Sequence, residues 1–167
     1  MQSRILIPEV LIGQMQETFP KHTGTTIFRG VISMNLIDVI GYNNFLKSLF
    51  PNGMDDNVLI GKLSFELGGR FGVSIHTKQR PAKEVPKWGK WGVDYNVIVI
   101  HLLGGKGEVV NIKNWNDVEY SSVYLKKCDA GFSIQQSGAS HDIYFLFDAL
   151  TFQNCSTYVD NTDISDI

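Results

Sequence analysis

The sequence has few of the residue patterns that mark a catalytic or metal-binding centre. Its two cysteines, Cys128 and Cys155, have neither CxxC spacing nor a neighbouring histidine cluster, so no zinc site or dithiol redox motif is indicated. The segment "LGGKGE" lacks the GxxxxGK[ST] spacing of a phosphate-binding loop and connects two expected strands instead. These absences exclude the classes of function that are easiest to recognise from residues alone.

Long apolar runs are also missing. The apolar stretch after Met1 covers only about nine residues and is broken by Pro8 and Glu9, which is too short for a signal peptide or a membrane-spanning helix. We therefore expect a cytoplasmic protein that does not bind a membrane and whose cysteines stay reduced. Its 167 residues, 43% of them hydrophobic, suit a single domain, 1–167, with one core.

The net charge of -2 conceals an uneven distribution of charge along the chain. Residues 61–115 carry nine basic and four acidic side chains, whereas residues 116–167 carry two basic and eight acidic ones. Such asymmetry is typical of surfaces that recognise charged partners, and it is equally compatible with an ordinary solvated surface. The chain as a whole is not basic enough to indicate direct binding of nucleic acid.

The spacing of apolar residues changes at residues 51–57, "PNGMDDN". Before this point, residues 36–50 have helical spacing, with Asn35 as the expected N-cap and Pro51 as the stop. After it the period is two, which predicts strands at 59–67, 71–76, 95–103, 108–115, 119–127, 131–136, 141–148 and 150–159. In the first strand the alternation places Leu59, Leu63, Phe65 and Leu67 on one face.

Short connections between successive strands imply antiparallel neighbours. We therefore predict an α+β fold, in which a large twisted antiparallel β-meander sheet has one N-terminal helix packed on it. A two-residue turn at Gly68 and Gly69 is expected to join the first two strands. Residues 34–160 form the predicted core, 161–167 a tail, and 1–33 an N-terminal extension to which the pattern assigns no structure.

No candidate catalytic residue emerges from the remaining motifs. Ser140, His141 and Asp142 are consecutive, so their side chains alternate across a strand and cannot form a nucleophile–base–acid chain. His76 and His101 could meet across the sheet, but a histidine pair without a third ligand is more often structural than metal-binding. We predict no catalytic, cofactor-binding or metal-binding residue and no enzymatic activity.

The segment "RPAKEVPKWGKWGVDYN", residues 80–96, places two tryptophans in a loop rich in proline, glycine and lysine. Trp88 and Trp91 either fold back over the sheet and hold the loop in place, or stay accessible as anchors for a partner. The residues assigned to a hypothetical partner-binding surface are Trp88, Trp91, Lys90, Asp129, Asp142, Asp148 and Asp160. The four carboxylates, in the acidic C-terminal third, would face a basic partner.

The order of these features resembles the immunity protein 50 family, whose members are immunity proteins of bacterial polymorphic toxins. The resemblance covers residues 34–160 and is carried by "IDVIGYNNFLKSLF", "LSFELGG", "FGVSIHTKQRP", "VPKWGKWGVDYNVIVIHL", "VNIKNWN" and "STYVD". It implies a non-enzymatic cytoplasmic protein that binds a cognate toxin domain and occludes its active site or substrate surface.

Two other functions are compatible with the residues. One is a small-molecule-binding domain or enzyme with a site in the concave mouth of the sheet, near His76, His101 and Trp91. The other is a structural module of a larger symmetric assembly. A cavity lined by the two histidines would favour the first of these, whereas a flat or convex charged face would favour the toxin-binding protein.

Overall fold

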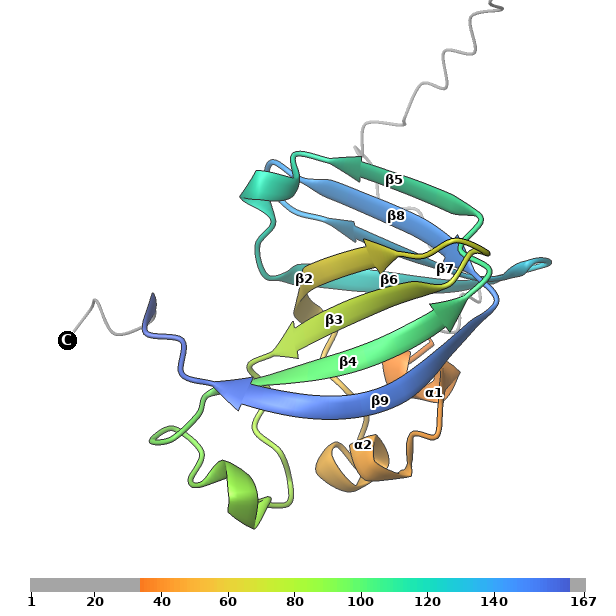
Figure 1. The fold of residues 1–167 in the computed structure, drawn as a ribbon. Helices are drawn as coiled ribbons and strands as arrows, with labels where there is room; N and C mark the ends of the chain where they lie inside the picture. Colours follow the sequence, from red (N-terminus) through yellow and green to blue (C-terminus); the bar gives the residue numbers. More distant parts are fainter. Residues whose placement is uncertain (1–33, 163–167) are drawn as a thin grey trace, which may run out of the picture. The chain divides into compact units, whose positions relative to one another are not determined.

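The computed structural model describes residues 34–162, which contain a nine-stranded mixed sheet with few short helices (Figure 1). The order of strands across the sheet is β1-β9-β4-β3-β2-β6-β7-β8-β5, and only β1 and β9 pair in parallel. The strands are β1 (Ile40–Gly41), β2 (Asn57–Phe65), β3 (Phe71–Thr77), β4 (Val97–Gly105), β5 (Val109–Lys113), β6 (Ser121–Cys128), β7 (Gly131–Ser137), β8 (Asp142–Phe147) and β9 (Ala149–Tyr158). The expected extension, residues 1–33, lies outside the described residues, as do residues 163–167.

A large sheet is present as predicted, and so is each strand expected after residue 57. The predicted antiparallel meander is wrong, because the sheet is mixed and β4 pairs with β9 while β5 pairs with β8. The first hairpin turn is longer than expected, because the backbone N–H of Glu66 donates to the carbonyl of Arg70 and leaves three residues between them. Both Gly68 and Gly69 have positive φ angles in this turn, a conformation that glycine adopts without steric cost.

The single helix expected over residues 36–50 is wrong in detail, because two short helices replace it: α1 (Leu36–Val39) and α2 (Asn44–Leu49). Asn35 caps α1 as predicted, accepting a hydrogen bond from the backbone N–H of Ile37. Residues 40–41 then leave the helix to pair with residues 150–151 of β9. Gly41 is a weak helix former, which is consistent with the end of the helix before it.

The sheet is folded into two halves that face each other across the core (Figure 1). One half contains β9, β4, β3 and β2, and the other contains β6, β7, β8 and β5. The ladder between β2 and β6 involves only Asn57 and Val58 on β2. Phe71 of β3 packs edge-to-face on Phe145 and Phe147 of β8, with ring centroids 5.7 and 6.0 Å apart. Aromatic packing therefore closes the two halves onto one core.

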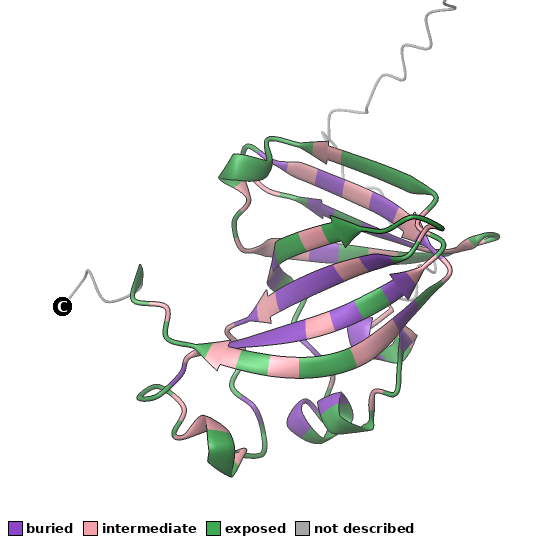
Figure 2. Cartoon of the chain, in the orientation of Figure 1, coloured by how far each residue is buried: buried purple, intermediate pink, exposed green. Residues whose placement is uncertain are grey.

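The first half has a buried inner face and an open outer face. Along β3, Phe71, Val73 and Ile75 are buried on the inner face, while the alternate positions carry the partly exposed Gly72 and His76 and the buried Ser74. Figure 2 shows buried and half-buried residues along this strand. Helix α2 covers the same inner face, since the ring of its Phe45 packs on the ring of Phe152 of β9, with centroids 5.9 Å apart. The outer face of this half is the side that α2 leaves uncovered.

A bulge at Gly61 changes which side chains of β2 reach each face. The register of β2 on β3 shifts between Ile60 and Lys62, so Leu59 lies opposite His76 on the outer face. Leu63 lies opposite Val73 on the inner face, so the prediction that Leu59 and Leu63 share one face is wrong. Glycine is required at the bulge because a Cβ there would overlap the His76 ring.

Substitution of Gly104 tests the closure of the core. Gly104 of β4 lies opposite Phe71, and a Cβ at this position would overlap the phenyl ring. We expect Gly104→Ala to lower the free energy of unfolding by about 1–3 kcal/mol, the usual cost of overpacking a closed core. Chemical denaturation measures this change. The double variant Gly104→Ala/Phe71→Leu should lose less than the sum of its single changes, and strictly additive losses would contradict the overlap.

Candidate functional site

The outer face of β2, β3, β4 and β9 carries a group of polar side chains centred on His76 and His101. Residue pairing places these residues in two adjacent rows that cross the four strands: Lys62, Ser74, His101 and Asn154, then Leu59, His76, Val99 and Ser156. The two histidines are diagonal neighbours on one face, so they do meet across the sheet as the sequence indicated.

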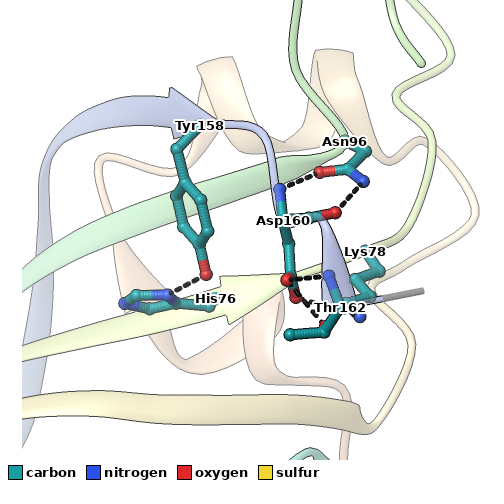
Figure 3. Close-up of polar contacts among 6 residues, drawn as sticks. All are labelled: His76, Lys78, Asn96, Tyr158, Asp160 and Thr162. Carbon is teal, nitrogen blue, oxygen red and sulfur yellow. Dashed lines mark hydrogen bonds and ion pairs between the residues drawn. The ribbon is translucent and has the colours of Figure 1, made fainter. Parts of the chain in front are cut away.

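His76 is held by contacts from three strands. Its Nδ1 lies 3.1 Å from the hydroxyl oxygen of Tyr158 on β9 (Figure 3). Its Nε2 lies 3.4 Å from the Oγ of Ser74. The ring also occupies the space above Gly61 of β2. Burial lowers the pKa of His76 from its ordinary value of 6.5, and the nearby charge of His101 lowers that pKa further. His76 is therefore neutral at pH 7.

His101 has one polar contact across the ladder between β4 and β9. Its Nε2 lies 2.9 Å from the Oγ of Ser156, close to the ideal hydrogen-bond distance. Within residues 34–162 no group of three or more histidine, cysteine or acidic residues could hold a metal ion. Each imidazole can form hydrogen bonds through its ring nitrogens.

The histidines lie on an open surface and do not line any of three hollows found elsewhere in the described region. These hollows have volumes of about 220, 310 and 440 Å³. They are lined mainly by residues near α1, the start of β2 and Lys78. Enzyme and cofactor sites usually enclose most of the ligand in a cleft.

Trp88 and Trp91 brace the loop that precedes β4. The ring of Trp88 packs edge-to-face on Phe45 of α2 and on Tyr95, at 5.9 and 5.8 Å between centroids. The ring of Trp91 also packs edge-to-face on the buried Tyr95, with ring centroids 5.2 Å apart. Both indoles are half-buried, so the contacts are those of the bracing alternative. The side chain of Lys90, between them, is exposed.

The indoles and the imidazoles lie on opposite sides of the sheet. Trp88 contacts Phe45, which covers the inner face at Phe152, whereas His76 and His101 point outward. The concave site expected from His76, His101 and Trp91 together is therefore not formed by these three residues.

The four predicted acidic contacts do not form one patch. Asp129, in the turn between β6 and β7, lies near Asp148, because Gly131 contacts the backbone of Phe147 and Asp148. Asp142 begins β8 and so lies at the opposite end of that strand, where it accepts a hydrogen bond from Ser137. Asp148 is 3.7 Å from the Lys106 ammonium. Asp160 follows β9, at the far end of that strand from Asp148.

Asp160 secures the end of β9 to the start of β4 (Figure 3). The side-chain oxygen of Asn96 accepts a hydrogen bond from the backbone N–H of Asp160 at 2.6 Å, and the side-chain nitrogen of Asn96 donates to the backbone carbonyl of Asp160 at 2.8 Å. Its carboxylate accepts from the hydroxyl and the N–H of Thr162 and pairs with Lys78 at 3.1 Å. The Thr162 hydroxyl, then the Thr162 N–H and then Lys78 lower the pKa of Asp160 to about 2. This carboxylate is therefore used within the fold.

Ser140 and His141 precede β8, which begins at Asp142, so the three consecutive residues do not alternate within one strand as expected. His141 is buried, and its Nε2 lies 3.3 Å from the Oγ of Ser121. The carboxylate of Asp142 accepts a hydrogen bond from the Ser137 hydroxyl. The three neighbours thus make separate contacts and do not form a relay.

Comparisons of the chain with protein-family models, curated proteins and solved structures found no match. The resemblance noted from the sequence therefore stays a prediction, and the functional argument rests on geometry. None of the helices within residues 34–162 is long and apolar enough to cross a membrane.

Removal of the Trp88 ring tests whether it braces the loop. We expect Trp88→Ala to lower the free energy of unfolding by about 2 kcal/mol or more, because the indole links α2 to Tyr95. Thermal and urea denaturation measure the loss. Lys87→Ala, at an exposed neighbour in the same turn, is the matched control and should leave stability unchanged. Equal stability of the two variants would show that the indole is not a brace.

The lowered pKa of His76 predicts that acid destabilises the fold. Between this lowered pKa and 6.5, the unfolded chain binds more protons than the folded chain, so the free energy of unfolding rises with pH. The groups facing the ring are Tyr158, Ser74 and His101. Urea denaturation between about pH 5 and pH 7.5 should show a shallower pH dependence for His76→Gln than for the unsubstituted chain. An identical dependence would rule out this contribution from His76.

Proposed function

We propose that this chain is a non-enzymatic binding protein that neutralises a bacterial toxin domain by covering its active site or substrate surface. The observation that carries the proposal is the outer face of β2, β3, β4 and β9, which presents Lys62 and two histidines that line none of the three hollows. A surface of this kind can dock against a protein, whereas small substrates are normally bound in an enclosing cleft.

The side chains of this face are held in place before any partner arrives. Tyr158 positions His76, Ser156 positions His101, and the contacts of Asp160 fix the end of β9 beside Tyr158. Side chains that are already ordered lose less conformational entropy on binding, which favours affinity. An inhibitor that only has to cover a toxin surface needs this rigidity more than it needs a pocket.

The size of the face sets how much of an interface it can supply. Four strands spaced about 4.8 Å apart and seven residues long cover roughly 450 Å². A standard interface takes roughly 800 Å² from each partner. Loops at the borders of the face would therefore contribute to the complex, and the turn between β2 and β3, with its fully exposed Leu67, is one such border.

An enzyme or small-molecule-binding domain is the alternative function. Its expected site lies in the concave mouth of the sheet near His76, His101 and Trp91. The two histidines and the indole lie on opposite sides of the sheet, which favours this alternative less. Two imidazoles beside hydroxyl groups remain its main support.

The coding sequence adjacent to that of this chain provides the direct test. We expect its product to arrest growth when expressed alone in a bacterial host, and co-expression of this chain to restore growth. The purified pair should elute together in size-exclusion chromatography. Co-expression of an unrelated folded domain is the control for a general effect on expression.

Two results would contradict the proposal. One is full growth arrest in the presence of the folded chain. The other is turnover of a small substrate by the chain alone, lost in His76→Gln or His101→Gln, which would establish the enzymatic alternative.

A further inference from the structure

The outer face is rich in hydrogen-bond donors and carries no carboxylate within the ladders that join β2, β3, β4 and β9. Beyond the two central rows, the paired outward positions are Ser64, Gly72, Leu103 and Thr151 on one side and Val97 with Tyr158 on the other. Lys62 is the one permanently charged side chain in these rows, and it is exposed. The row that begins at Lys62 continues with the hydroxyl of Ser74, the imidazole of His101 and the amide of Asn154. The face therefore ranges from neutral to positive.

Carboxylates at the borders of the face have cationic partners of their own. Glu66 pairs with Arg70 at 3.1 Å, beyond the end of β2. Asp160 pairs with Lys78 at 3.1 Å beyond the end of β9. Because these acids are engaged outside the rows, they do not cancel the charge of Lys62 or compete for the donors beside it.

The accessible donors of this row suit the carboxylates of an acidic segment. Lys62 is exposed and His101 is half-buried, whereas Ser74 between them is buried and lies 3.4 Å from a ring nitrogen of His76. Lys62 and His101 project from strands that are separated by β3, so they lie about 10 Å apart and can each bind a different carboxylate of one segment. A hydrogen bond from an ammonium donor to a carboxylate is stronger than one between neutral groups.

We propose that this face docks an acidic segment of a protein partner, with its carboxylates bound by Lys62 and His101. The inference rests on the proposed function for its choice of a protein partner. A polynucleotide fits less well, because binding to phosphates depends on several lysine and arginine contacts and the rows contain only Lys62.

Titration of the full isotope-labelled chain with a hexaglutamate peptide tests the docking chemistry directly. We expect saturable NMR shifts of the backbone amides of Ser74, His101 and Ser156, and no such shifts with hexalysine. Lys62→Glu and His101→Glu should each weaken peptide binding by about tenfold or more, because like charges then face each other. The matched control is Lys127→Glu, an exposed lysine on β6 in the other half of the sheet, which should bind as the unsubstituted chain does.

The growth assay with the adjacent gene product separates this inference from the proposed function. If the unsubstituted chain restores growth, Lys62→Glu and His101→Glu should restore it less well than Lys127→Glu. Full protection by both face variants would overturn the inference while leaving the proposed function intact. If the unsubstituted chain does not protect, the proposed function fails, and the peptide titration still decides whether the face binds acidic chains.

Two further outcomes would overturn the inference. Hexalysine shifts equal to those of hexaglutamate would show that charge does not select the ligand. Tighter binding of a short oligothymidylate at the same amides would replace the protein partner with a nucleic acid. Thermal melts establish folding, and if His101→Glu does not fold, Lys62→Glu at its exposed position decides the test.

Discussion

The packing of Phe71 against Phe145 and Phe147 is the contact on which the rest of the fold depends. The backbone ladder between the two halves of the sheet is short, with only Asn57 and Val58 of β2 paired to β6. The rings therefore hold the halves together by burying their inner faces against each other. Once those faces are buried, the outer face of β2, β3, β4 and β9 is the part of this half left open to a partner.

The aromatic residues and the polar residues of this half have separate roles. Trp88 and Trp91 enclose Tyr95, and Trp88 also contacts Phe45 of α2, so the long loop before β4 helps to cover the inner side of the sheet. This explains why tryptophan occurs in a segment that otherwise has the composition of a loop. The imidazoles project from the other side, where their contacts are hydroxyl groups.

Local patterns predicted the strands but not the contacts between distant segments. Alternation of apolar residues was sufficient to locate the strands and to suggest that His76 and His101 meet. The bulge at Gly61 escaped prediction because it depends on the register with β3, and the break between α1 and α2 depends on pairing with β9. Tyr158 reaches His76 from 82 residues away in sequence and from two strands away in the sheet. No periodicity in the sequence marks that contact.

The charge asymmetry along the chain has a different meaning once the chain is folded. Lys78 and Lys106, from the basic middle segment, pair with Asp160 and Asp148 from the acidic C-terminal third. Such partly exposed pairs contribute little stability, but each one cancels a charge that the linear sequence counts as available. Lys62 is the permanently charged side chain in the two central rows of the outer face. We infer from the folded arrangement that this face would suit an acidic partner, whereas the acidic C-terminal third indicated a basic partner from the sequence alone.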